Sequence, residues 1–82
     1  MERYFFDVED GYLTKDTEGR ELAGFDAIAE AAMSTLLEIA RFEVVNNNER
    51  ELSVAVRNEA GEPIYRASVI VKAGWLAGTK SR

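Results

Sequence analysis

The stretch Phe25–Phe42, FDAIAEAAMSTLLEIARF, carries the one long helical pattern of this chain and decides its fold class. Gly24 is an acceptable N-cap before it, and Asp26 places a negative charge in the first turn, where the helix dipole favours it. The apolar side chains cover roughly half of the helix circumference, whereas packing on one sheet needs a stripe of about 100°. We therefore predict one amphipathic helix whose apolar arc exceeds what a single sheet covers.

The excess part of this arc lies at Met33, Leu37 and Val44, and two interpretations of it stay open. In the first, these side chains are half-buried edge positions of a monomer, shielded by their neighbours. In the second, they form a helix face that meets another chain. The second interpretation makes Met33 and Leu37 candidate contact residues.

The chain before the helix alternates with a period of two, which predicts a strand with one buried face over Arg3–Glu9. The buried face carries Tyr4, Phe6 and Val8. Phe5 falls among the polar side chains of the other face. We therefore treat Phe5 as a further candidate contact residue.

A hairpin is predicted to follow this first strand. Asp10-Gly11 is a strong turn signal, and Tyr12–Lys15 can return as a second strand. Asp16–Gly19 then indicates another turn, in which Gly19 takes a positive φ.

After the helix, Asn46–Glu49 is expected to end the helical segment, and the period changes back to two. Strands are predicted at Leu52–Arg57 and Ile64–Val71, joined by a hairpin loop at Asn58–Gly61. Pro63 stands at the entrance of the last strand, where its missing N–H costs least.

Assembled, these elements predict an α+β fold with the order ββαββ. It has two layers, a four-stranded antiparallel sheet and one helix that covers one face of it. Residues 1–72 form a single compact domain in this prediction, and the spatial order of the strands stays open.

Residues 73–82 form a C-terminal tail that contains Trp75 and Leu76. Chain ends fray unless they are tied down, so an indole here needs a contact. Either Trp75 folds back onto the edge of the domain's own core, or it docks on a partner. Trp75 and Leu76 complete the set of candidate contact residues.

The charges are unevenly distributed. Lysine and arginine number 10 against 15 aspartates and glutamates, for a net charge of −5, yet residues 63–82 hold four bases and no acid. This balance argues against binding of a phosphate backbone by the whole surface. The basic end is a solvated tail, or it contacts an acidic surface such as that of a second copy.

Cysteine and histidine are both absent, which excludes disulfides, a thiolate nucleophile and the usual zinc ligands. No phosphate-binding glycine loop and no serine elbow occurs. The EF-hand spacing of acids fails around Gly11, Gly19 and Gly61. We therefore expect that the chain is not an enzyme and has no catalytic residue, cofactor or metal.

The N-terminal residues lack the pattern of a secretory signal, and no apolar stretch approaches the roughly 20 residues that span a bilayer. We expect a soluble protein of the cytoplasm without membrane contact.

These residues resemble a family of small uncharacterised alphaproteobacterial proteins, a domain of unknown function. The resemblance spans roughly residues 3–72 and rests on three segments. They are RYFFDVEDG at residues 3–11, DTEGREL at residues 16–22 and VAVRNEAGEPIY at residues 54–65. It implies a stand-alone compact domain with no assigned activity.

The chain departs from this family's pattern at two places. Members often have a histidine at the position of Asp7, and a Pro-Asp pair where this chain has Ala23-Gly24. The first departure removes any role that a histidine had there.

The leading hypothesis is a protein-interaction module that acts as a homodimer through Met33 and Leu37 or through the Trp75 tail. The alternative is a ligand-binding or nucleic-acid-binding module that uses the outer sheet face around Phe5 and Ile64. The chain is also faintly similar to HicB-type antitoxins, so an antitoxin-like regulator is a further alternative function. The DNA-binding segment that is usual in those proteins is not visible in this sequence.

Overall fold

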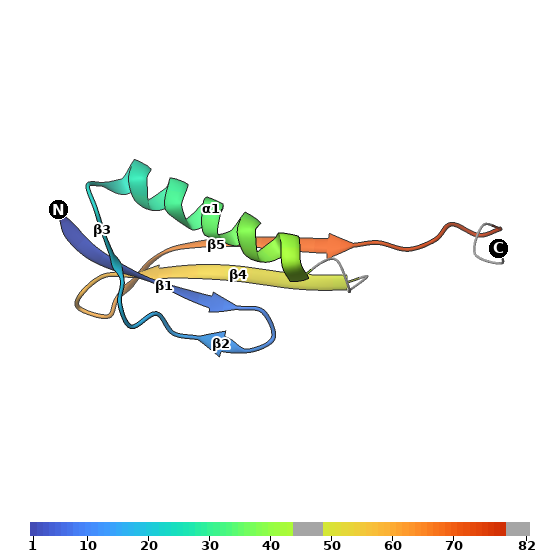
Figure 1. Cartoon of the computed structure of the whole chain (residues 1–82), viewed down its shortest axis with the longest axis horizontal. Coiled ribbons are helices and arrows are strands. Elements are labelled where there is room, and N and C mark those ends of the chain that lie inside the picture. Colours follow the sequence, from blue (N-terminus) through green and yellow to red (C-terminus); the bar gives the residue numbers. More distant parts are fainter. Residues whose placement is uncertain (44–48, 79–82) are drawn as a thin grey trace.

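A computed structural model of the chain describes residues 1–43 and 49–78. One helix lies over one face of an antiparallel sheet, which confirms the predicted α+β class (Figure 1). The elements in chain order are β1 (Glu2–Glu9), β2 (Leu13–Thr14), β3 (Arg20–Leu22), α1 (Phe25–Glu43), β4 (Glu49–Arg57) and β5 (Pro63–Lys72).

The strand order in space is β2-β1-β4-β5, and β3 pairs with the first residues of β1. All pairs are antiparallel. The register places Phe6 opposite Val56, and Val56 opposite Tyr65. Opposed residues share a face of the sheet, so the apolar positions of β1, β4 and β5 face the helix together.

The prediction of four strands is wrong in one respect, because Arg20–Leu22 forms a further short strand, β3. The chain leaves β1 at the Asp10–Tyr12 turn, pairs briefly as β2, bulges at residues 15–19 and returns to pair with β1. The predicted turn at Asp16–Gly19 is therefore an interruption of the return strand.

The Asp16 carboxylate holds this interruption in place. One oxygen accepts the backbone N–H groups of Glu18 (3.0 Å) and Gly19 (3.1 Å), and the other accepts the N–H of Phe6 in β1 (3.1 Å). A side chain thus supplies the acceptor that a neighbouring strand supplies elsewhere in a sheet. The bulge stays attached to β1 although its backbone does not pair there.

A second set of bonds ties the bulge to β4. The Asp16 N–H donates to the Asp7 carboxylate (2.9 Å), and Arg57 bridges the two segments. Its Nε contacts Asp7 Oδ2 at 2.8 Å, and its Nη2 donates to the Asp16 carbonyl at 2.7 Å. We call Asp7, Asp16 and Arg57 the bulge clamp.

Gly19 has the predicted positive φ, at 70°. A Cβ atom there would lie 2.9 Å from the Tyr4 carbonyl oxygen and 2.9 Å from the Phe5 ring. Both the backbone angle and the close approach to β1 therefore require glycine.

The core lies between α1 and the middle strands. On the helix it consists of Ile28, Ala32 and Leu36, which are spaced by four residues and therefore share one stripe. On the sheet it consists of Phe6, Leu52, Val54, Val56 and Ala67. The Gly24 carbonyl accepts the Ile28 N–H at 3.0 Å, as expected for an N-cap.

The helix ends at Glu43 in the described part, close to the predicted end. The predicted stop at Asn46–Asn48 and the apolar position Val44 lie outside the described residues. Within residues 1–43 and 49–78, no helix is long and apolar enough to cross a membrane.

The hairpin loop between β4 and β5 forms where the sequence predicts it. Gly61 has φ 86°, and the Asn58 side-chain oxygen accepts the N–H groups of Ala60 (3.0 Å) and Glu62 (2.9 Å). An asparagine that closes its own turn in this way defines where β5 starts.

We expect Asp16→Asn to destabilise the fold by about 1–2 kcal/mol, because an amide replaces one of two acceptor oxygens by a donor. Burial alone raises the pKa of Asp16, but the N–H groups of Gly19, Phe6 and Glu18, with Arg20, together hold it below the usual 3.8. A lowered folded pKa contributes stability above pH 3.8, and this stability is lost as the pH falls through the folded value.

Urea unfolding at neutral and acid pH measures this difference. On acidification, wild type loses the contribution of the Asp16 carboxylate to its free energy of unfolding. The difference in unfolding free energy between wild type and Asp16→Asn therefore becomes smaller. Glu18→Gln is the matched control in the same bulge, and it should change little at either pH. An Asp16→Asn variant as stable as wild type at neutral pH contradicts the clamp.

Leu36→Ala should cost about 2–5 kcal/mol of unfolding free energy, because Leu36 is 1% exposed at the centre of the core. Leu13, which is 60% exposed on β2, gives the control. Leu13→Ala should stay within about 0.5 kcal/mol of wild type in the same denaturant titration. Equal losses for the two variants would mean that the helix does not pack as described.

Candidate interaction surface

β5 is the outermost strand on one side of the sheet. Among the described residues it pairs with β4 along one edge, and no strand pairs with its other edge. It is ten residues long, and its one proline, Pro63, stands at the first position. Such an edge presents a row of backbone N–H and C=O groups to any further strand.

Met33 and Leu37 lie on the flank of α1 that overhangs this edge. The helix packs mainly over β4 and β5 (Figure 1). Thr35, which accepts a hydrogen bond from Arg20 of β3, marks the opposite flank. Met33 and Leu37 are each two residues from Thr35 and so point about 160° away from it. Their side chains therefore lie on the β5 side.

Both residues are largely accessible, with 44% of Met33 and 54% of Leu37 exposed. Sequence reasoning left open whether neighbouring side chains cover them. Within one copy, roughly half of each residue stays exposed, and both interpretations of these positions allow this degree of burial.

The side chains of β5 continue this apolar area. Tyr65 points to the helix face, and Ile64 and Ile70 point to the open face. All three are exposed, Ile70 most of all at 63%. We call the combination of α1 flank and β5 side chains the edge surface. It consists of Met33, Leu37, Ile64, Tyr65 and Ile70.

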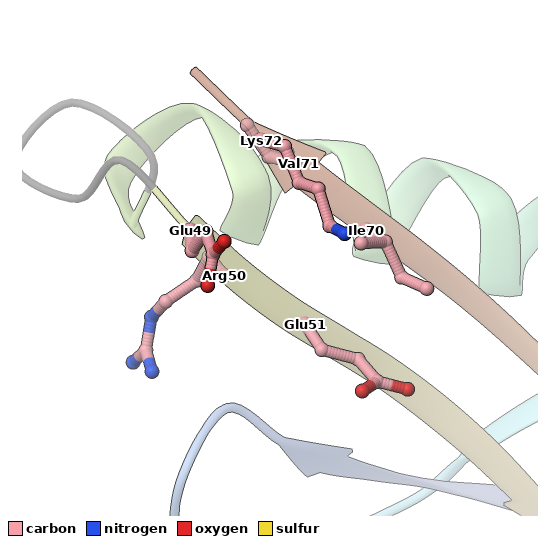
Figure 2. A pocket seen from close by; sticks show the side chains of 6 residues that line it. All are labelled: Glu49, Arg50, Glu51, Ile70, Val71 and Lys72. Atoms are coloured by element: carbon pink, nitrogen blue, oxygen red, sulfur yellow. The ribbon is translucent and has the colours of Figure 1, made fainter. Parts of the chain in front are cut away.

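A shallow hollow lies where β4 begins and β5 ends (Figure 2). Figure 2 shows the Lys72 amine extending toward Ile70, with the Glu51 side chain nearby on β4. Arg50 points away from them and contacts Glu43 at 2.9 Å and the Asp10 carbonyl. The residues that line the hollow are Glu49, Arg50, Glu51, Ile70, Val71 and Lys72.

Phe5 lies on the open face, as predicted, but the structure does not present it as a free ring. The Arg57 guanidinium lies 4.7 Å from the ring centroid, and the residue is only partly exposed. Phe5 and Gly19 also approach closely. The ring therefore packs within the fold and is separated from the edge surface.

Trp75 and Leu76 follow β5 in the segment 73–78, which we call the C-terminal arm. The arm continues away from the body in line with β5 (Figure 1). Trp75 is 80% exposed and Leu76 is 79% exposed. Of the two arrangements considered for Trp75, folding back onto the chain's own core is not the one observed.

The structure therefore brings Met33 and Leu37 together, places the arm at the end of the same strand and sets Phe5 apart. Sequence reasoning named Ile64 only for the alternative binding module on the outer sheet face, and it missed Ile70 as a contact residue. Their signal was present, because both fall on the polar face of a ten-residue strand without an acid. This pattern indicates a contact surface only when the strand order is known, because that order places β5 at an edge of the sheet.

Among residues 1–43 and 49–78, no group of three or more acids is placed to hold a metal ion. The bulge clamp uses its carboxylates to accept hydrogen bonds from the backbone and from Arg57.

Comparison with curated proteins and with solved structures gives no significant match. A family model does match the chain over residues 3–70, which covers β1 through most of β5. The chain therefore belongs to the family described as a domain of unknown function, DUF6894.

Proposed function

We propose that this domain is a protein-interaction module that acts by contact rather than by catalysis, as a homodimer held through the edge surface. The observation that carries the proposal is the coincidence of two features on one side of the molecule. Within residues 1–43 and 49–78, no strand pairs with the outer edge of the ten-residue strand β5. Met33 and Leu37, both half exposed, overhang that same edge.

Strand addition is the contact that such an edge favours. Backbone groups at the edge of β5 can pair with an incoming strand, and this supplies affinity independent of sequence. The flanking apolar side chains then supply specificity. The chain that adds the strand also brings the side chains and the helix that cover its own sheet, and these contact Met33 and Leu37. The hydrophobic gain adds to the hydrogen bonds of the backbone.

The charge pattern around β5 favours a second copy as the occupant. Glu59 and Glu62 precede the strand, whereas Lys72 is its last residue. When two such strands run antiparallel, the acidic end of each meets the basic end of the other. A strand that is complementary to itself in this way selects its own copy.

Domain size supports the same conclusion. A chain of 82 residues without cysteine cannot add a disulfide to its one core. Small domains commonly gain stability from a partner chain instead. The lack of cysteine also suits a reducing compartment, so we place the dimer in the cytoplasm.

The outer sheet face is less suited to nucleic acid. The aromatic ring there, Phe5, is already covered by Arg57, and stacking on a base requires a free ring face. The carboxylates of Asp7, Glu9 and Glu51 lie on the same face as Arg57, Arg66 and Lys72, so this face has no excess of positive charge to attract phosphates.

The homodimer is tested by sedimentation or light scattering over a concentration series. We expect a species of about 18 kDa, twice the chain mass of 9.2 kDa. Leu37→Glu should shift it to the monomer, because a charge would be buried in the interface. Ile70→Lys, on β5, should do the same.

Leu13→Glu is the control, since Leu13 is an exposed leucine on the opposite side of the sheet. It should remain dimeric. Circular dichroism confirms that each variant is folded. Wild-type protein that stays at 9.2 kDa up to high micromolar concentration would refute the proposal.

A further inference from the structure

We infer that two copies pair β5 with β5 about a twofold axis at Ala67, and that each C-terminal arm lies along the β4–β5 hairpin of the other copy. This inference rests on the proposed homodimer. It specifies the register of the interface and gives the arm, residues 73–78, a binding site.

The faces of the sheet restrict the possible registers. Residues directly opposed in an antiparallel pair lie on the same face, and neighbours along a strand alternate between faces. The axis of a symmetric pair must therefore pass beside a residue and not between two residues. The candidates near the middle of β5 are Ala67, Ser68 and Val69.

Side-chain chemistry separates these three registers. An axis at Val69 places Arg66 opposite Lys72 of the second copy, which opposes like charges. An axis at Ser68 places Lys72 opposite the apolar Ile64.

An axis at Ala67 avoids both of these pairings. Ile64 then lies opposite Ile70 of the second copy, and Tyr65 lies opposite Val69. Ile64 and Ile70 are exposed in one copy, so this register covers two apolar side chains with each other. Cross-strand apolar pairs of this kind stabilise a sheet.

The same register brings Glu62 of one copy beside Lys72 of the other. Glu62 stands immediately before β5, and Lys72 is its last residue. The twofold axis is perpendicular to the sheet, so both α1 helices lie on one face. Their Met33 and Leu37 flanks then face each other across the axis.

The arm follows from this arrangement. It continues β5 in line (Figure 1), so beyond Lys72 it passes the hairpin of the second copy, residues 58–62. That end of the molecule carries the acids Glu59 and Glu62 with the exposed Phe25, at 84%. The arm supplies complementary chemistry, since it presents the apolar ring of Trp75, which can pack beside Phe25.

Trp75 is the single tryptophan of the chain, so its fluorescence reports the position of the arm. We expect the emission to shift to the blue, and iodide quenching to weaken about twofold or more, as the protein dimerises. The monomeric Leu37→Glu variant should keep the emission of an exposed indole at every concentration. Truncation after Lys72 should weaken the dimer about tenfold without abolishing it.

The register is tested by exchange of charges. Glu62→Lys and Lys72→Glu each place like charges together twice per dimer, and each should raise the dissociation constant about 3- to 10-fold. The double variant Glu62→Lys/Lys72→Glu should return to within about twofold of wild type. Glu18→Lys, which is outside the interface, is the control for net charge.

The outcomes separate the inference from the homodimer on which it rests. A dimer in which Trp75 emission does not change with concentration overturns the arm site, and the proposed function stands. A dimer in which the double variant is no better than the single variants overturns the register at Ala67. A chain that is monomeric throughout overturns both the inference and the proposed function.

Discussion

The packing of one helical stripe on β4 is the contact that determines the rest of this structure. Ile28, Ala32 and Leu36 are spaced so that only one line of the helix enters the core, and Leu52, Val54 and Val56 receive it. Because β4 lies next to β5, the helix axis runs over these two strands and not over the middle of the whole sheet. The flank with Met33 and Leu37 consequently reaches beyond the last strand. The apolar area of the helix that the sheet leaves exposed is thus a consequence of the packing of Ile28, Ala32 and Leu36 on β4.

The two sides of the sheet handle their edges differently. On one side, β1 is followed by strands of two and three residues with a bulge between them, and the bulge clamp occupies hydrogen-bonding groups of β1 through side chains. Short strands and bulges are the devices by which proteins prevent pairing at an edge. On the other side, β5 runs for ten residues with its irregularity confined to the start. This asymmetry is the reason that we propose β5, and not the opposite edge, as the interaction surface.

Sequence periodicity predicted the helix, the four strands β1, β2, β4 and β5 and both hairpin turns because each depends on neighbouring residues. The Phe25–Glu43 helix and the Asn58–Gly61 loop are local in this sense, since propensity and turn chemistry act within a few positions. β3 was missed because its three residues carry no alternation, and its position depends on Asp16 accepting the N–H of Phe6, ten residues earlier. The strand order was also beyond the sequence, since it depends on contacts between β1 and β4 across the whole helix. Met33 and Leu37 could therefore be identified as candidates, but not the edge beside them.

If dimerisation buries the edge surface, folding and association become linked. A partner that binds only the folded chain stabilises it by mass action, so the apparent stability of the domain rises with its concentration. The core of one copy alone is small, since the described part of the chain places eight hydrophobic residues in the buried cluster. The domain would then be least stable when dilute and most resistant to unfolding when abundant. The stability of the fold and the association of two copies are then directly coupled, because the core residue Leu36 and the surface residue Leu37 lie on the same helix. Any shift of α1 that loosens the packing of Leu36 also moves Leu37.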